Sequence, residues 1–174
     1  MTHFLQASRA IIFDFDGTIF DSNDIKKSCF ADVFNDQCFV DQDLLNFISS
    51  LGNVDRFAVI SACAEYFFGG VYTELDVQDK VTAYSKCCHQ RILSANEIPG
   101  ALNFIKLAHK YKYSLFISSA TPQRELIEIV ESLKIMNYFE GVFGGPESKV
   151  SHINFISDDY PNQAKAFGVN IYAE

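Results

Sequence analysis

Short apolar runs along the chain predict β-strands that are buried on both faces. The clearest run, residues 10–13, is continuously apolar before the first carboxylate, as is typical of strands in parallel sheets. A second run, residues 113–117, ends at two serines. The expected strands are residues 10–15, 113–117, 142–143, 154–157 and 169–172.

Residues 22–96 show only helical periodicity. Apolar side chains recur there at helical spacing in four segments, residues 24–34, 44–51, 57–68 and 77–93.

Elsewhere the expected strands alternate with helices, at residues 99–108, 122–133 and 160–167. In the second of these helices, Thr121 is expected as the N-cap and Pro122 as the first helical residue. This alternation predicts an α/β core with a parallel sheet and an inserted helical segment. We therefore expect a discontinuous core domain, residues 1–21 and 97–174, and a helical domain, residues 22–96.

Polar residues gather at the expected carboxyl ends of the strands, the edge at which open α/β sheets bind ligands. They are Asp14 and Asp16, Ser118 and Ser119, and Asp158 and Asp159.

The first of these pairs has the chemistry of a metal site. In a continuous strand, residues two apart point to the same side, so Asp14 and Asp16 would converge. Two converging carboxylates repel each other unless a cation or a shared proton lies between them. Hard oxygen ligands of this kind suit Mg²⁺.

Residues 14–18, DFDGT, resemble the DxDGT signature of the haloacid dehalogenase-like superfamily of phosphohydrolases and phosphotransferases. The resemblance implies that Asp14 is the nucleophile, which forms an aspartyl-phosphate. Asp16 would act as the acid and base and as a metal ligand, and Thr18 would join the phosphate-binding residues. The alternative for the two aspartates is a pair that caps a helix.

Two further motifs carry the resemblance. Ser118 resembles the second motif, whose hydroxyl binds a phosphoryl oxygen while the Ser119 amide assists; alternatively, these serines only cap the next helix. Lys149 resembles the third motif, a lysine that offsets charge between nucleophile and phosphate. A solvated surface lysine is the alternative.

Residues 157–162 resemble the fourth motif, which in many members reads GDxxxD. Asp158 would bind Mg²⁺ directly. Asn162 stands where many members have Asp, and Ser157 where many have Gly. Asp159 is either a second acid near the metal or a helix N-cap.

The helical insertion matches in place and size the cap of the phosphoglycolate phosphatase and β-phosphoglucomutase-like branch, which implies a Rossmann-like three-layer core plus an α-helical cap. Caps close over the site and exclude water. Arg56 stands where a cap loop could reach the substrate, although a surface arginine is an equal alternative.

The resemblance departs from the family in one place. Only eight residues separate Lys149 from Asp158, whereas parallel strands need a crossover of a dozen residues or more. We expect that a disordered stretch near residues 151–154 and a C-terminal tail are missing from the chain. The alternative is a natural deletion, which would leave the metal site incomplete.

Composition and charge narrow the partners. The chain has 174 residues, 48% of them hydrophobic, which suits one full domain or one domain with an insertion. Its net charge of −8 argues against nucleic acid or an anionic membrane as the main partner. We expect no signal peptide and no membrane span.

The cysteines bear on the compartment. Five cysteines without CxxC spacing suggest buried, reduced thiols in a cytoplasmic protein, with a vicinal Cys87–Cys88 disulfide as a rare alternative.

These features together predict a Mg²⁺-dependent phosphatase that acts on a small phosphorylated metabolite. The alternatives are a phosphomutase of the same family, which returns the phosphoryl group to the substrate, and a catalytically impaired binding or regulatory protein with this fold.

Overall fold

The computed structural model describes residues 9–34, 41–52, 54–69 and 71–168. The chain divides into two compact units, Met1–Ser22 with Ile92–Glu174 and Asn23–Arg91. The first, the core unit, carries all the described strands, and the second, the helical unit, is built from helices. The expected domain boundaries and the role of the helical unit as a cap stay predictions.

Four parallel strands form the sheet of the core unit, in the spatial order β3-β2-β1-β4. They are β1 (Ala10–Phe13), β2 (Ser114–Pro122), β3 (Gly141–Gly145) and β4 (Ala164–Phe167). β1 lies in the middle, where its Phe13 pairs with Ile117 of β2 and with Phe167 of β4. All four residues of β1 are buried, which explains why they are continuously apolar.

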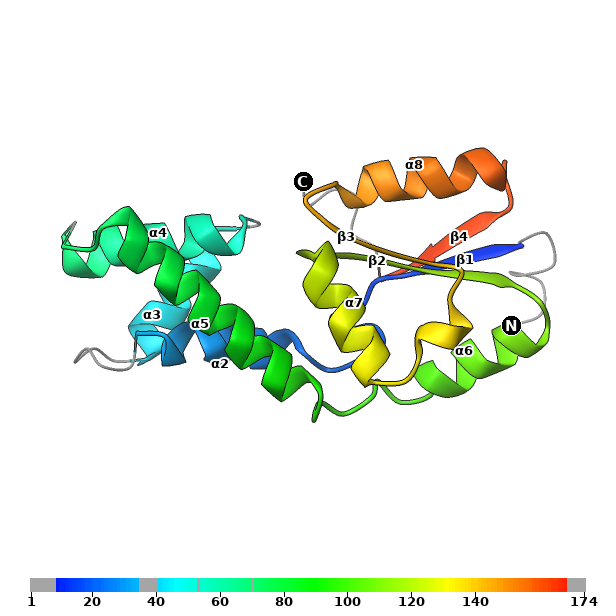
Figure 1. Ribbon diagram of the computed structural model, residues 1–174, viewed down its shortest axis with the longest axis horizontal. Helices are drawn as coiled ribbons and strands as arrows, with labels where there is room; N and C mark the ends of the chain where they lie inside the picture. Colours follow the sequence, from blue (N-terminus) through cyan, green and yellow to red (C-terminus); the bar gives the residue numbers. More distant parts are fainter. Residues whose placement is uncertain (1–8, 35–40, 53, 70, 169–174) are drawn as a thin grey trace. The chain divides into compact units, whose positions relative to one another are not determined.

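Helices cover both faces of this sheet (Figure 1). On one face lie α6 (Ala101–Lys110), α7 (Gln123–Ser132) and the 3-10 helix η1 (Met136–Tyr138), and on the other lies α8 (Lys149–Asp159). Ala10, Ile12 and Phe116 point toward α8 and form a core cluster with its Ile156. The structure thus confirms the three-layer α/β fold. Because the chain passes from β1 to β2 and β3 and then returns to β4, the strand order reverses beside β1, where such sheets bind ligands.

Two expected elements near the C-terminus are wrong. Residues 154–157 belong to α8 instead of a strand, and residues 164–167 form β4 instead of a helix. The physical reason is the crossover: β3 and β4 are parallel, so the chain between them needs a helix, and α8 supplies it. The strand expected at residues 169–172 lies outside the described residues.

The helical unit contains α2 (Asn23–Asp32), α3 (Asp41–Ser50), α4 (Arg56–Phe68) and α5 (Glu74–Ile92), whose last residue reaches the core unit. Asp55 caps α4 by accepting a hydrogen bond from the Ala58 amide at 2.9 Å. Gly69 ends α4 in the left-handed conformation at φ 58°, which glycine adopts without strain.

A disulfide between Cys29 and Cys87 joins α2 to α5, with the two Cα atoms 5.8 Å apart. The expectation of reduced thiols is therefore wrong for these two residues. Cys63 and Cys88 are buried, as expected, and Cys63 is a free thiol. Packing of helices that are distant in sequence creates the pair, which spacing alone does not reveal. The cysteines thus no longer argue for a reducing compartment. Cys38 lies outside the described residues.

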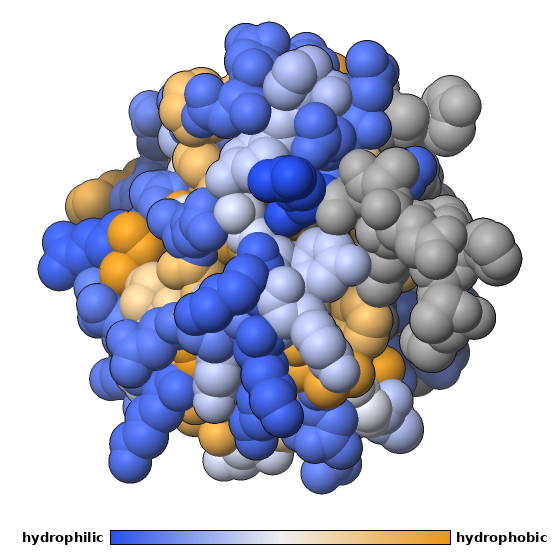
Figure 2. Space-filling model, turned by 90° about the vertical axis from the view of Figure 1, so that its right-hand side faces the viewer, coloured by the Kyte–Doolittle hydropathy of each residue, from blue (hydrophilic) through white to orange (hydrophobic). Residues whose placement is uncertain are grey.

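Hydrophilic side chains prevail on the face of the molecule in Figure 2, and the apolar patches there are small and separated. Within the described ranges, none of the helices combines the length and apolar character that crossing a bilayer requires.

Candidate active site

Asp14 lies just beyond the carboxyl end of β1 and is held from three sides. Its amide donates to the Phe167 carbonyl at 2.9 Å, which ties β1 to β4. Its Oδ1 accepts from the Phe15 amide at 2.7 Å, and its Oδ2 accepts from Lys149 Nζ at 2.9 Å. Only 11% of the Asp14 side chain and 18% of the Lys149 side chain are exposed. The structure therefore pairs the expected nucleophile with the expected lysine.

Burial raises the pKa of Asp14 above its usual value of 3.8. The hydrogen bond and the positive charge of Lys149 lower this pKa, as does the Phe15 amide, but the negative charge of Asp16 raises it again. Burial and Asp16 thus outweigh Lys149, so the Asp14 carboxylate would gain from a further cation.

Three hydroxyl groups surround Asp16. Ser22 Oγ donates to Oδ1 at 2.6 Å, and Ser119 Oγ and Thr121 Oγ1 each approach Oδ2 at 3.4 Å. Asp16 lies in the loop after β1, where Gly17 has a φ of 68°, a conformation that favours glycine. This set brings the loop after β1 and the carboxyl end of β2 together.

The two serines of β2 point to opposite faces of the sheet, and the phosphate-binding role expected for Ser118 stays a prediction. Ser118 is fully buried, and its Oγ lies 2.9 Å from His152 Nδ1 instead of at Asp16. Ser119 carries the hydroxyl at the aspartate. Because successive side chains of a strand point to opposite faces, only one of two adjacent serines can face Asp16.

Thr121 also differs from the expectation. It was expected as the N-cap of the following helix, but β2 continues through Pro122, which is itself the N-cap of α7. Thr121 shares the phase of Ser119, two residues before it. Side chains two apart in a strand point to the same side, so the sequence could have placed Ser119 and Thr121 together at Asp16. Ser22 is only six residues after Asp16 and could have been included for that reason. No sequence pattern pointed to His152.

Thr18 lies against the end of β4. A Cβ added to Gly168 would lie 2.0 Å from Thr18 Oγ1, and Gly168 has a φ of 70°. Only glycine therefore allows the chain after β4 to pass so close to the DxDGT loop.

The structure does not bring the fourth expected motif to this site. Asp158 is exposed in the last turn of α8, roughly 13 Å along the helix axis from Lys149 at 1.5 Å per residue. Asp159 is exposed beside it, and Asn162 lies in the turn before β4 with a φ of 59°. The strand that was expected to present Asp158 is helix, so the expected placement of Asp158 is wrong.

Arg56, the expected substrate contact, begins α4 in the helical unit. Its Nη1 donates to Ser85 Oγ, and its guanidinium lies 5.3 Å from the centre of the Tyr84 ring. These contacts hold it against α5, and its expected contact with a substrate stays a prediction.

Asp14 and Asp16 are the residues that would hold a metal. Within the described part of the chain, no group of three or more Asp, Glu, His or Cys residues is placed to bind one. Mg²⁺ is commonly bound by one or two carboxylates, with water and phosphate oxygens completing its six ligands. The repulsion that Asp16 exerts on Asp14 fits such a cation.

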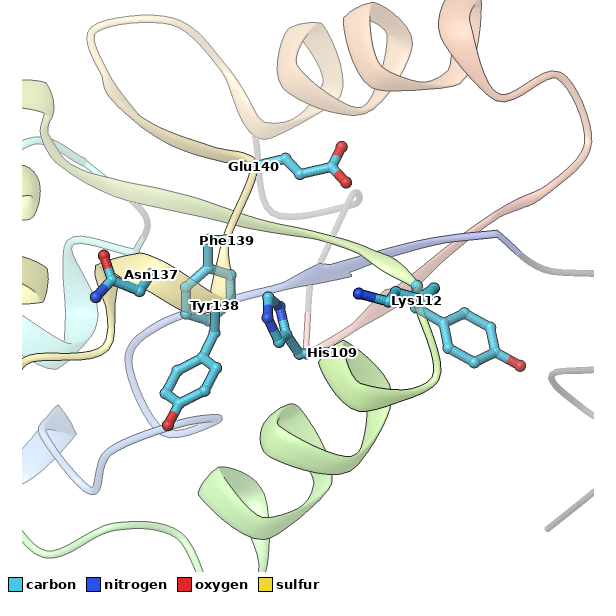
Figure 3. A pocket seen from close by; sticks show the side chains of 7 residues that line it. His109, Lys112, Asn137, Tyr138, Phe139 and Glu140 are labelled. Atoms are coloured by element: carbon cyan, nitrogen blue, oxygen red, sulfur yellow. The ribbon is translucent and has the colours of Figure 1, made fainter.

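A cavity of about 310 Å³ lies elsewhere in the core unit, at the amino ends of β2 and β3 (Figure 3). None of its residues was expected to be functional. Asp14, Asp16 and the hydroxyl groups around Asp16 lie at the opposite, carboxyl edge of the sheet. Its lining consists of His109, Lys112, Tyr113, Asn137, Tyr138, Phe139 and Glu140.

Comparison with known proteins identifies the fold and the family. No curated protein matches the chain. A predicted phosphoglycolate phosphatase from Haemophilus somnus is similar in structure, with a TM-score of 0.72, 13% identity and coverage of 93% of this chain and 77% of that one.

Two other solved structures are also similar. A provisionally assigned β-phosphoglucomutase from Thermotoga maritima has a TM-score of 0.73 and 18% identity, covering 91% of this chain and 75% of that one. The provisionally assigned hydrolase YfnB from Bacillus subtilis, solved with magnesium, has a TM-score of 0.70 and 16% identity, covering 97% and 82%. At these identities the likeness shows the fold.

The sequence model of the haloacid dehalogenase-like hydrolase family matches residues 11–156, from the buried strand before Asp14 into α8, the helix that carries Lys149. The match covers most of the chain, which therefore belongs to the haloacid dehalogenase-like hydrolase family.

Proposed function

We propose that the protein is a Mg²⁺-dependent phosphatase of small phosphate monoesters. The observation that carries the proposal is the pairing of Asp14 with Lys149 beside Asp16, at the carboxyl edge of the sheet. A buried carboxylate next to a cation is arranged to attack an electron-poor centre while the negative charge of the incoming phosphate is offset.

Asp14 would attack phosphorus through a carboxylate oxygen and form an aspartyl-phosphate, while Asp16 gives a proton to the departing ester oxygen. Asp16 would then take a proton from the water that hydrolyses this intermediate. Ser22, Ser119 and Thr121 orient the Asp16 carboxyl group for both steps through their hydroxyl groups. Lys149 offsets charge on Asp14 and on the phosphoryl group.

Mg²⁺, when bound, would neutralise phosphate oxygens and reduce the repulsion between the carboxylates. Asp14 and Asp16 would hold it, with water and phosphate completing the coordination. The magnesium in the structurally similar YfnB supports this choice of metal. Asp158 has no part in this proposal because α8 carries it away from the site.

Small phosphorylated metabolites are the proposed substrates. The names of two structural neighbours, a predicted phosphoglycolate phosphatase and a provisionally assigned β-phosphoglucomutase, support this class, as does the acidic net charge, which disfavours polyanions. We propose that the helical unit acts as a cap that excludes water.

The decisive experiment is hydrolysis of p-nitrophenyl phosphate with Mg²⁺ and with EDTA, by the parent and by Asp14→Asn. The proposal predicts metal-dependent release that Asp14→Asn loses. Release that is insensitive to both changes, or no release, would contradict it.

The neighbour described as a β-phosphoglucomutase supports the alternative of a phosphomutase. Conversion of glucose 1-phosphate to the 6-phosphate without release of free phosphate would favour this alternative over hydrolysis.

A further inference from the structure

Ser118 and His152 form a buried hydrogen-bonded pair that the proposed chemistry does not use. The distance from Ser118 Oγ to His152 Nδ1 is 2.9 Å, and the two residues are 0% and 5% exposed. The pair joins β2 to α8, the elements on either side of the site. The His152 ring lies 5.6 Å from the Phe143 ring of β3, tilted by 33°, which restricts its orientation.

The same face of α8 carries Lys149 and His152. Residues three apart are neighbours on a helix surface, and Ile156, four residues further, packs into the core cluster on this side of the sheet. α8 is thus fixed to the sheet at two adjacent points, by Lys149 to Asp14 after β1 and by His152 to Ser118 on β2.

These two points are close in the sheet as well. Asp14 and Ser118 directly follow Phe13 and Ile117, the last residues paired between β1 and β2. A shift of the first turn of α8 along the sheet would therefore move Lys149 and His152 together. The apolar contacts that α8 makes with the sheet through Ile156 are non-directional, whereas the hydrogen bond from His152 to Ser118 is directional and favours one position of this turn.

A polar pair of this kind is not needed for stability alone, since apolar residues of similar shape can replace a buried hydrogen bond at little cost. We propose that His152 is a positioning residue: through its hydrogen bond to Ser118, it holds the first turn of α8 so that Lys149 stays on Asp14. This inference rests on the proposed function, in which Lys149 offsets charge during phosphoryl transfer.

Four variants of the full chain test the inference by p-nitrophenyl phosphate hydrolysis. His152→Phe keeps a ring against Phe143 but removes the hydrogen bond, and Ser118→Ala removes the other partner. We expect each to lower kcat about five- to tenfold with little change in KM, and the double variant to be no worse than either alone. His152→Asn, which can place an amide near Nδ1, should recover part of the loss.

The other end of α8 offers a matched control. There Tyr160, the C-cap of α8, donates from its Oη to Ser114 Oγ of β2 at 2.8 Å and to Glu140 Oε2 at 3.2 Å. This contact lies eleven residues beyond Lys149 in the chain. Tyr160→Phe should lower thermal stability without lowering kcat. Equal kcat losses in Tyr160→Phe and His152→Phe would overturn the inference, because any loosening of α8 would then suffice.

A second measurement needs no turnover. Lys149 is labelled with a limiting amount of acetic anhydride and quantified by peptide mass spectrometry relative to the exposed Lys110. His152→Phe and Ser118→Ala should each raise Lys149 labelling several-fold, because an amine released from Asp14 is more accessible. Unchanged labelling in both variants overturns the inference. If the parent hydrolyses no phosphate ester, the proposed function fails, and the labelling alone decides whether His152 positions Lys149.

Discussion

Replacing Gly168 by alanine tests whether the end of β4 supports the DxDGT loop. A Cβ there would lie 2.0 Å from Thr18 Oγ1 and 3.0 Å from its Cβ and Cγ2, at a φ of 70°. The left-handed conformation costs alanine about 1–2 kcal/mol, and displacing Thr18 adds about 1–3 kcal/mol. Gly168→Ala should therefore destabilise the protein by roughly 2–5 kcal/mol.

Gly100→Ala is the matched control. Gly100 also has a positive φ, 86°, but an added Cβ would meet nothing within 4 Å. Gly100→Ala should therefore lower the free energy of unfolding only by the cost of the left-handed backbone conformation, about 1–2 kcal/mol. At roughly 2–4 °C per kcal/mol for a chain of this size, Gly168→Ala should melt lower than Gly100→Ala by about 2–12 °C.

Thermal melting and p-nitrophenyl phosphate hydrolysis by the same variants complete the test. Gly168→Ala should also lower kcat, because Thr18 belongs to the loop that holds Asp16, whereas Gly100→Ala should not. Adding Thr18→Ala to Gly168→Ala removes the closest atoms and should restore part of the stability. Equal melting temperatures for the two glycine variants would refute the close approach of β4 to the loop.

Three further predictions address charge, the disulfide and the fourth motif. The pKa of Asp14 in the native state lies above 3.8, so the native state binds the carboxyl proton more tightly than the unfolded chain does. The resulting stabilisation is complete below about pH 3.8 and is lost as the pH rises through the native pKa. Asp14→Asn should therefore melt higher than the parent at pH 7 and approach it near pH 4 in differential scanning fluorimetry; a lower melting temperature at pH 7 would contradict this sign. Cys87→Ser removes the disulfide with Cys29, which closes a loop with a sequence separation of 58, and should lower the free energy of unfolding by up to about 4 kcal/mol. Thermal melting of the parent with and without dithiothreitol should show the same loss of stability. Asp158→Asn should change kcat by less than about twofold because this residue is exposed in the last turn of α8, whereas a loss of several hundredfold would restore the motif-based placement.

The sequence was most informative where a buried apolar run is followed directly by candidate catalytic carboxylates. The buried strand that ends just before Asp14 lies in the middle of the sheet, and Lys149 contacts Asp14 although the two are 135 residues apart in the sequence. Both could be predicted because an apolar run followed by carboxylates and glycine restricts the local backbone strongly, and because the family resemblance supplied the lysine.

The sequence was least informative about which side chains of a strand face the site and about contacts between residues that are distant in the chain. Ser118 and Ser119 are adjacent, so their side chains lie on opposite faces, and the sequence does not show which of them faces Asp16. For residues 154–167, local apolar content suggested a strand and then a helix, but the parallel β3–β4 connection required the reverse order. The Cys29–Cys87 disulfide depends on helix packing within the helical unit, which no local pattern encodes.

In the proposed mechanism, Asp14 carries the phosphoryl group during turnover. Acid quenching during hydrolysis of p-nitrophenyl phosphate, followed by peptide mass spectrometry, measures this directly. We expect one phosphoryl group on Asp14, which hydroxylamine removes and which is absent from Asp14→Asn. Steady release of p-nitrophenol with Asp14 unmodified, or with the phosphoryl group on another residue, would contradict it.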